Sequence, residues 1–453
     1  MIPHDPQATL ADVLQARERR SQWQWELLQR FKRPLICFTM NIAGPVKNDD
    51  LISEGFRLGA ELLKAQLAGE GIHLLYTQER FLHTGCEGFY VADAQPRRLK
   101  ELMVAIEDDA PVGRLFDMDV LDVSGQKQER QELGLHGRRC LLCSEPAMVC
   151  ARSRAHRVEE LQNRTRELLL DAVRQRDSRH IARLATQSLL YEVCVTPKPG
   201  LVDRNHNGSH RDMDIFTFMA SAAALSPYFG DCAKVGMQTR ELPPKETFRK
   251  LRLSGKVAQW DMLEATAGVN THKGAIFTLG LLCAGAGRLA AYDRTGERIA
   301  AECAAMTRGL ICSDLQNRSA HGGTAGQRLY ASYGVTGVRG QAEAGFPAVL
   351  QTGLPTLEHC LRQGMTIDAA GGVTLLSLLT VTQDTNIMAR SDRETLERLR
   401  LELTELLTRD PYPDRQTLLE LDRQFVAQNL SPGGAADLLA ASFFLHFLSA
   451  EKE

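Results

Sequence analysis

The hydrophobic pattern of this sequence changes near Arg176, and that change constrains the fold more than any other feature. Before Arg176, β-rich apolar runs such as Pro34–Ile42 are interspersed with segments of helical periodicity. After it, strand-like alternation nearly vanishes, and long Ala-, Leu- and Gly-rich runs recur at helical spacing. The pattern predicts a multidomain chain: an N-terminal α/β domain over residues 1–175, then an all-α helical domain over residues 176–453.

Composition excludes some classes of partner. The chain has 453 residues and a formal charge of -2, so it has no overall electrostatic attraction for nucleic acid or an anionic membrane. The longest uncharged apolar run, Gly274–Gly287, is too short to span a bilayer. The N-terminal stretch has no apolar core typical of a signal peptide, and the 11 cysteines are an odd number. These features predict a cytoplasmic protein with reduced thiols, and neither a nucleic-acid nor a membrane partner.

A dense polar segment, Thr196–Asp214 (TPKPGLVDRNHNGSHRDMD), lies between two apolar runs with helical periodicity, Leu184–Val195 and Ile215–Leu225. We expect Pro227 to end the second of these helices. A polar loop held between buried helices is typical of a binding site, although a solvated surface loop remains an alternative. Its cations suit phosphate and its acids suit Mg²⁺ or ribose hydroxyl groups. The cations are Lys198, Arg204 and His210, and the acids are Asp203, Asp212 and Asp214.

Three further segments of the C-terminal half carry polar residues beside apolar helices. Asn270, Thr271, His272 and Lys273 precede the apolar run Ala275–Ala286, an arrangement typical of an anion site at a helix N-terminus, or of a capped helix with an incidental lysine. Asp384 and Asn386 follow the apolar run Val373–Val381.

The last of these segments, Asn429–Asp437, starts the final helix. We expect Ser431 to cap this helix and Pro432 to be its first residue, with Gly433 and Gly434 next. Asp437 would lie one turn inside, where an inward acid needs a partner or a metal. Another Gly-rich polar loop is predicted over His321–Pro347. Polar loops joined by apolar helices suggest a bundle with its site at one end.

In the N-terminal half, the run Gly113–Asp122 (GRLFDMDVLD) carries alternating carboxylates. On a strand, Asp117 and Asp119 would point to the same face, where two acids repel each other unless a cation lies between them. Mg²⁺ with a triphosphate is the expected occupant, so the domain is predicted to be a nucleotidyltransferase-like mixed sheet. Asp122 has the wrong parity and is only a candidate third ligand. The alternative is an exposed strand edge.

A cluster of possible zinc ligands follows in RRCLLCSEPAMVCARSRAH. Its spacing is Cys140-x2-Cys143-x6-Cys150-x5-His156, a legitimate tetrahedral set. Structural zinc is one interpretation, and reduced cysteines packed in a core are the other. A zinc-containing scaffold or nucleic-acid adaptor is therefore kept as a second class of function, although the charge balance and the lack of interleaved aromatic residues disfavour it.

Five segments of the C-terminal half together resemble the triphosphoribosyl-dephospho-CoA synthase family of citrate lyase biogenesis. They are TPKPGLVDRNHNGSHRDMD, GVNTHKGAIF, YGVTGVRG, QDTN and NLSPGGAADLL. The N-terminal half resembles the citrate lyase holo-acyl-carrier-protein synthase family in FTMNIAGPVK, GRLFDMDV and the region from RRCLLC to CAR. The chain therefore looks like a natural fusion of two enzymes.

The resemblance implies two consecutive transfers. In the C-terminal domain, the ribose 2′-hydroxyl of dephospho-CoA attacks C1 of the ATP ribose and expels adenine. In the N-terminal domain, a serine of the apo-acyl carrier protein of citrate lyase, a transient partner, attacks the α-phosphate of that product and releases pyrophosphate. The same pair of reactions serving the carrier of malonate decarboxylase is the alternative.

These reactions give the candidate residues their expected roles. Mg²⁺ would be held by Asp117 and Asp119 in one domain and by Asp212 and Asp214 in the other. The expected catalytic residues are Asp117, Asp119, Asp203, Asp212, Asp214, His210, His272 and Lys273. The expected substrate-binding residues are Lys47, Arg114, Lys198, Arg204, Asn270, Thr271, Asp384, Asn386, Ser431, Gly433, Gly434 and Asp437.

Two positions depart from the synthase pattern. Gln327 and Gln341 stand where a Glu is usual, and Glu343 is close enough in sequence to compensate.

Overall fold

The computed structural model describes residues 7–316 and 325–450. The chain divides into two compact units, Met1–Gln175 and Arg176–Glu453. The 37-residue helix α5 (Val158–Cys194) runs through the boundary. Leu169 in its first part belongs to the core of the N-terminal unit, and Ile181 in its second part belongs to the core of the helical unit.

The N-terminal unit is built on a four-stranded sheet with the order β2-β3-β1-β4. Its strands are β1 (Leu35–Met40), β2 (Leu74–Leu82), β3 (Gly85–Ala92) and β4 (Phe116–Leu121). Helix α2 (Asp50–Gly69) connects β1 to β2, and α3 (Pro96–Asp109) connects β3 to β4, which is the split βαβ arrangement of ferredoxin-like domains.

Every neighbouring pair of strands in this sheet is antiparallel. The expected mixed sheet is therefore wrong, although the α/β class is confirmed. The reason is topological: each helical crossover skips one strand, so an oppositely directed strand always lies between the two parallel ones.

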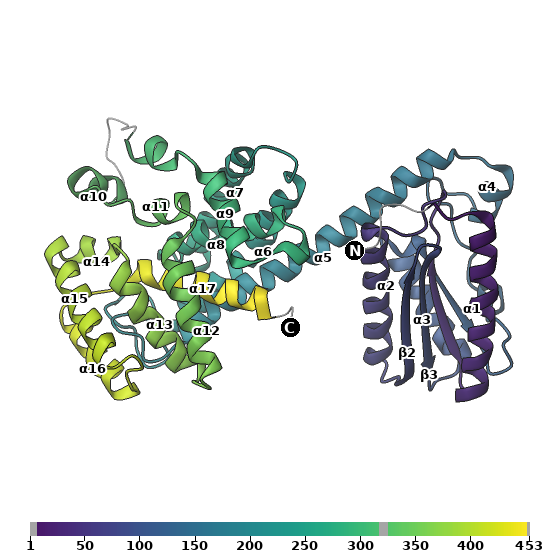
Figure 1. Ribbon diagram of the computed structural model, residues 1–453, viewed down its shortest axis with the longest axis horizontal. Coiled ribbons are helices and arrows are strands. Elements are labelled where there is room, and N and C mark those ends of the chain that lie inside the picture. Colours follow the sequence, from purple (N-terminus) through teal and green to yellow (C-terminus); the bar gives the residue numbers. More distant parts are fainter. Residues whose placement is uncertain (1–6, 317–324, 451–453) are drawn as a thin grey trace. The chain divides into compact units, whose positions relative to one another are not determined.

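Helices cover both faces of this sheet (Figure 1). Phe38 and Phe116 pack on one face with residues of α2 and α3. Cys37 and Phe89 pack on the other face with Leu27 of α1 (Leu10–Phe31). Side chains alternate along β4, with Phe116, Met118 and Val120 on the face of α2 and α3. Asp117 and Asp119 therefore lie on the α1 face.

The second unit is helical throughout its described residues (Figure 1). Beyond α5, its helices are α6 (Ile215–Gln238), α7 (Pro244–Ala265), α8 (Lys273–Arg288), α9 (Gly296–Thr307), α10 (Ala325–Tyr333), α11 (Gly337–Glu343), α12 (Leu354–Arg362), α13 (Ile367–Val381), α14 (Thr385–Arg390), α15 (Arg393–Arg409), α16 (Arg415–Ala427) and α17 (Gly433–Ala450). The predicted all-α C-terminal half is confirmed.

Helices α6 and α8 pack closely because glycines remove side chains from their interface. A Cβ at Gly236 would lie 2.1 Å from the Ala284 oxygen, and one at Gly287 would lie 2.2 Å from the Ala233 oxygen. The expectation that Pro227 ends the first of these helices is wrong, since α6 continues to Gln238 with the proline inside it. The long packing surface with α8 and α7 outweighs the one backbone hydrogen bond that a proline removes.

The predicted polar loop over His321–Pro347 is also largely helical. Residues 325–333 and 337–343 form α10 and α11, and residues 321–324 lie outside the described part of the chain.

Helix α17 is long and apolar enough to cross a membrane by length and composition. In this unit it packs against α8, α13 and α12, and residues such as Phe443 and Phe444 are fully buried. Its composition is therefore explained by a position in the core.

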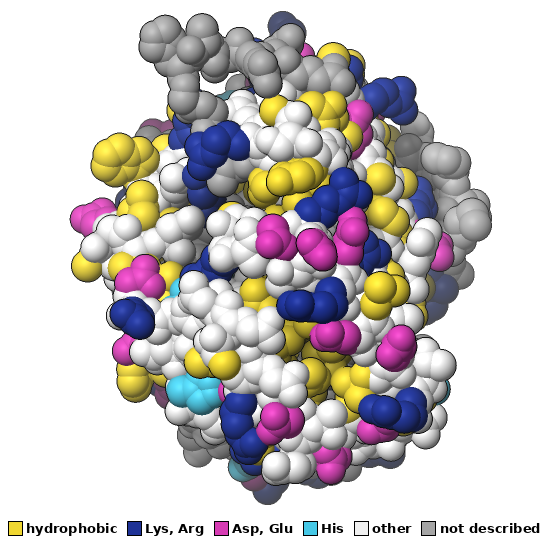
Figure 2. Space-filling model, turned by 90° about the vertical axis from the view of Figure 1, so that its left-hand side faces the viewer, with side chains coloured by type: hydrophobic (Ala, Val, Ile, Leu, Met, Phe, Trp, Pro, Cys, Tyr) yellow, Lys and Arg dark blue, Asp and Glu magenta, His cyan; other side chains and the backbone are white. Residues whose placement is uncertain are grey.

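Figure 2 shows one face of the helical unit, where cationic and anionic side chains are interspersed and do not form a single cationic surface. This mixture agrees with the formal charge of -2 for the whole chain.

Candidate active sites

A cavity of about 940 Å³ opens among the N-terminal ends of α8, α14 and α17 in the helical unit. It collects most of the residues predicted to act in this half. Those on its wall are Lys198, His210, Asp212, Asn270, Thr271, His272, Lys273, Asp384, Asn386, Ser431, Gly433, Gly434 and Asp437. Helix N-termini present unpaired N–H groups and a positive field, so this cavity suits an anionic ligand.

Asp384 joins two of these helix ends. Its carboxylate accepts hydrogen bonds from the backbone N–H of Asn386 at 2.9 Å and of Ile387 at 3.1 Å, and so caps α14. Its second oxygen accepts from the N–H of Ala435 at 2.9 Å, in the first turn of α17. Burial raises the pKa of Asp384, and these hydrogen bonds oppose the rise. Ser431 was expected to cap α17, but the side chain that accepts from the N–H of Ala435 in its first turn is Asp384.

Asp437 lies one turn inside α17, as predicted, and faces the start of α8. A Cβ at Gly274 would lie 1.8 Å from Asp437 Oδ2, so any larger residue would displace this carboxylate. Burial raises the pKa of Asp437 well above its ordinary value, and the charges of Glu192 and Asp384 raise it further. Three carboxylates thus share one poorly solvated region, which favours a bound proton or cation.

Glu192 is the residue of this group that the sequence analysis missed. It lies in the last turn of α5, is 4% exposed, and accepts a hydrogen bond from Lys198 Nζ at 2.5 Å. Burial raises the pKa of Glu192, and the charge of Lys198 opposes that rise. The signal was an acid inside an otherwise apolar helical run. Because Lys198 is held by this carboxylate, its expected role as a free phosphate ligand is not supported by its contacts.

His272 carries a buried ring nitrogen without a partner. Thr271 donates to the Ser221 hydroxyl, whose oxygen lies 2.7 Å from His272 Nδ1. The Ser221 hydroxyl therefore links Thr271 to the imidazole ring, whose other nitrogen is Nε2. This Nε2 has no hydrogen-bond partner and is buried in the cavity wall. Burial lowers the pKa of His272 to about 3, so the ring is neutral near pH 7.

His210 lies on another part of the wall. Its Nε2 is 2.8 Å from the Ser431 hydroxyl, and its Nδ1 lies 3.2 Å from a guanidinium nitrogen of Arg390. Burial and the Arg390 charge lower the pKa of His210, while Asp212 raises it. Asp212 itself is exposed, 3.9 Å from His210.

Three predicted residues are absent from the cavity wall. Asp203 accepts backbone hydrogen bonds from Lys198, Asn205 and His206 and holds its own loop together. Asp214 caps α6 through Thr217 and lies outside the cavity wall that holds Asp212. Arg204 binds Asp368 and the Thr196 hydroxyl. These hydrogen bonds indicate a structural role for all three residues.

The two glutamines have contacts of their own. Gln341 lines the cavity, and its side-chain oxygen accepts from the N–H of Ala348 at 3.2 Å. Gln327 donates to the Asp314 oxygen at 2.9 Å. Glu343 binds the N–H groups of Gly309 and Ile311, both at 2.8 Å, so it does not compensate for a missing acid in the cavity.

In the N-terminal unit, Asp117 and Asp119 lie on the same face of β4, as predicted. The register places Thr39 opposite both Asp117 and Glu87, so a third carboxylate, which the sequence analysis missed, shares this face. Each acid has a cationic partner: Arg138 for Asp117 at 2.9 Å, Lys127 for Asp119 at 2.8 Å and Arg20 for Glu87 at 3.4 Å.

The expected cations lie at one end of this sheet. Asn41, just after β1, donates to the Leu115 oxygen, so the loop that carries Lys47 lies beside the start of β4. Lys47 Nζ donates to the Ile42 oxygen at 2.6 Å, and burial, followed by the charge of Arg17, lowers the pKa of Lys47. Arg114 donates to the Cys140 oxygen at 3.0 Å.

Asp122 is not a third ligand of this group. Its carboxylate binds Ser124 and the N–H of Gln126, and so closes the turn that follows β4.

Comparisons with known proteins agree with this division of the chain. Residues 8–172 match the family model of the apo-citrate lyase phosphoribosyl-dephospho-CoA transferases (CitX), and residues 178–453 match that of the ATP:dephospho-CoA triphosphoribosyl transferases (CitG). The chain belongs to the CitX–CitG fusion family.

Relatives that resemble the whole chain have the same organisation. "Protein CitXG" of Haemophilus influenzae is 36% identical over 97% of this chain and 96% of its own length. "Protein CitXG" of Leuconostoc mesenteroides is 33% identical over 96% of both chains. A 2-(5''-triphosphoribosyl)-3'-dephosphocoenzyme-A synthase of Pectobacterium atrosepticum is 41% identical over 60% of this chain and 90% of its own. The protein is therefore a transferase with two domains.

Proposed function

We propose that this protein makes the prosthetic group of citrate lyase and attaches it to the carrier subunit. The helical unit would convert ATP and 3′-dephospho-CoA into 2′-(5″-triphosphoribosyl)-3′-dephospho-CoA and adenine. The N-terminal unit would then transfer phosphoribosyl-dephospho-CoA to a serine of the apo-acyl carrier protein and release pyrophosphate. The observation that carries the proposal is the cavity whose wall contains Asp384, Asp437 and the exposed Lys273 at the start of α8.

The first transfer requires three catalytic roles from residues on the wall of this cavity. A carboxylate stabilises the oxocarbenium-like ribose as adenine leaves, and a base accepts the proton of the attacking 2′-hydroxyl. Asp437 and Asp384 supply these groups, because both carboxylates lie on the cavity wall and burial raises the pKa of each. The unpartnered Nε2 of His272 forms a hydrogen bond with a polar atom of the substrate, and leaving it unpaired would cost about 1–3 kcal/mol.

Phosphate groups need positive charge at the same place. Lys273 is exposed at the first residue of α8, and Arg390 lies on the wall beside His210. Mg²⁺ fits this cavity as well, because the charge of Asp384 adds to burial in raising the pKa of Asp437, and a bound cation would relieve both effects. When bound, it would neutralise triphosphate charge, and Asp212 at the rim would extend the ligand set.

In the N-terminal unit, Asp117 and Asp119 would hold Mg²⁺ on the α1 face of the sheet, and Lys47 and Arg114 would stabilise the leaving pyrophosphate. The shared face of the two acids on β4, and the position of the Lys47 loop beside the start of that strand, support these roles. Both halves match transferase families, so the scaffold alternative has no support of its own.

Adenine release tests the helical unit. The purified chain is incubated with ATP, Mg²⁺ and dephospho-CoA, and free adenine is measured by chromatography. Asp437→Asn should reduce adenine release at least about 100-fold, since one positioned acid or base contributes this much. Asp231→Asn, at an exposed residue, is the matched control and should leave the rate unchanged. Equal rates in the two variants would refute the assignment of this cavity.

Carrier labelling tests the N-terminal unit separately. Apo-carriers of citrate lyase and of malonate decarboxylase are offered with pre-made triphosphoribosyl-dephospho-CoA, and their mass is followed. We expect the citrate lyase carrier to be modified, and Asp117→Asn to abolish the gain while the exposed Asp93→Asn keeps it. Preferential modification of the malonate decarboxylase carrier would replace the proposed partner.

A further inference from the structure

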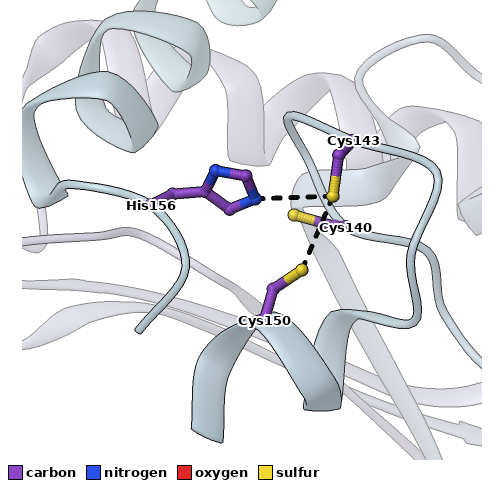
Figure 3. A group of neighbouring side chains, drawn as sticks. All are labelled: Cys140, Cys143, Cys150 and His156. Carbon is purple, nitrogen blue, oxygen red and sulfur yellow. Dashed lines mark hydrogen bonds between the residues drawn. The ribbon is translucent and has the colours of Figure 1, made fainter. Parts of the chain in front are cut away.

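A second cluster of chemically reactive side chains lies outside both candidate sites. Cys140 and Cys143 follow β4, Cys150 lies in α4 (Ala147–Ser153), and His156 precedes α5. Figure 3 shows these four side chains pointing toward one common point. Their ligand atoms all lie within 4.8 Å of one another.

Two distances among these ligand atoms are close to those of a tetrahedral metal site. With zinc–sulfur bonds of about 2.3 Å and a zinc–nitrogen bond of about 2.0 Å, two ligand sulfurs lie about 3.8 Å apart, and sulfur and nitrogen about 3.5 Å. Here Cys143 Sγ is 3.5 Å from Cys150 Sγ and 3.4 Å from His156 Nε2. Three sulfurs and one imidazole are a ligand set that prefers zinc to magnesium or calcium.

The backbone around the first two cysteines forms a short hairpin. Cys140 donates its N–H to the Glu145 oxygen at 2.7 Å, and Ala147 donates to the Arg138 oxygen at 2.8 Å. The N–H groups of Leu142 and Cys143 point to the sulfur of Cys140. A C-x2-C pair in such a hairpin is a common first half of a zinc site.

This segment has few apolar contacts to hold it without a metal. Leu142, Met148 and Val149 are exposed, and α4 has only seven residues. Cys140 and Cys150 are buried and provide most of the local interior. A short segment with so small a core commonly depends on a metal for its conformation.

We propose that one structural Zn²⁺ binds Cys140, Cys143, Cys150 and His156 and fixes the conformation of residues 138–156. All four coordination positions are filled by protein, so the site is closed to substrate. Two contacts connect it to the proposed transfer site: Arg138 binds both Asp117 and Glu107, and the Cys140 oxygen accepts from Arg114. Arg138 and Arg114 are therefore positioned by the metal-bound hairpin.

Metal analysis of the full chain tests this directly. Protein purified under reducing conditions should contain about one zinc per chain, as a closed four-ligand site requires. Cys143→Ser and His156→Ala should reduce the zinc content at least tenfold. Cys312→Ser, at an exposed cysteine of the helical unit, is the matched control and should keep it.

Cobalt replacement provides a measurement that needs no variant. After zinc is removed and Co²⁺ added, the wild-type chain should show the intense visible bands of a tetrahedral site and a sulfur-to-cobalt charge-transfer band. A chain that purifies without zinc and shows no such bands would overturn the proposal, as would a Cys143–Cys150 disulfide found under the same reducing conditions.

The last measurement links the metal to one unit. This link rests on the proposed function, whereas the metal analysis does not. Zinc removal should raise amide hydrogen exchange over residues 138–156 and reduce carrier labelling, while adenine release by the helical unit stays unchanged. Equal loss of both activities, or unchanged exchange in this segment, would refute the proposed positioning of Arg138 and Arg114.

Discussion

The buried pair of Lys198 and Glu192 gives a stability prediction whose size follows from the structure. Lys198 is 1% exposed and Glu192 is 4% exposed, with Nζ and Oε1 2.5 Å apart. In Lys198→Met, the Glu192 carboxylate loses its cationic partner. Because a buried, unpaired anion is unfavourable, Glu192 takes up a proton. With an ordinary Glu pKa of 4.5, this protonation costs about 3.4 kcal/mol at pH 7. Removal of one partner from other buried pairs costs a similar 3–5 kcal/mol.

The loss should depend on pH in a defined direction. In the variant, the folded state raises the pKa of Glu192 above its unfolded value, so stability is retained below the unfolded pKa and lost as the pH rises. The destabilisation should therefore fall from about 3.4 kcal/mol near pH 7 to about 0.7 kcal/mol near pH 5.

Differential scanning calorimetry of the full chain measures this effect. At about 2–4 °C per kcal/mol, the transition of the helical unit should move down by about 7–14 °C near pH 7. Lys234→Met removes the lysine of an exposed pair and should cost under about 1 kcal/mol. Adding Glu192→Leu to Lys198→Met should restore much of the stability. A loss as small as that of Lys234→Met, or one that is the same at both pH values, would refute the reasoning.

Three further predictions follow from single contacts. Gly274→Ala should abolish adenine release, because its Cβ would lie 1.8 Å from Asp437 Oδ2, while Gly230→Ala, with 3.5 Å to its nearest neighbour, should retain it. His272→Asn should flatten the pH dependence of urea unfolding. In the folded state His272 has a pKa of about 3 and stays neutral, whereas in the unfolded state it takes up a proton below about pH 6.5. Wild-type stability is therefore lost as the pH falls, at up to about 1.4 kcal/mol per pH unit relative to the variant, and parallel profiles would contradict this. Glu107→Gln should lower the unfolding free energy of the N-terminal unit by about 3 kcal/mol, because the 2% exposed carboxylate binds two arginines; urea unfolding that matches the wild type would argue against a buried network.

Local sequence patterns predicted the type and order of the elements well. Alternation along β4 placed Asp117 and Asp119 on one face, and helical periodicity identified α8 and α17 with polar residues at their N-termini. These properties depend on neighbours within a few positions, which is why periodicity reveals them. Sheet order does not depend on such neighbours, and the insertion of β3 between β2 and β1 made the sheet antiparallel.

The candidate site shows the same difference between what local sequence determines and what tertiary structure determines. The polar segments marked the region correctly, but an acid that caps its own helix has the same local sequence as one that faces a cavity. Asp214 caps its own helix, α6, and is absent from the cavity wall, whereas Asp384 caps α14 and also binds the N–H of Ala435 in α17. The charges of Asp384 and Glu192 both act on Asp437, although the three acids are far apart in the chain. The sequence by itself determined which segments are polar, helical or extended. Only tertiary packing decided which charged groups lose their water together, because desolvation and mutual repulsion depend on distances in space.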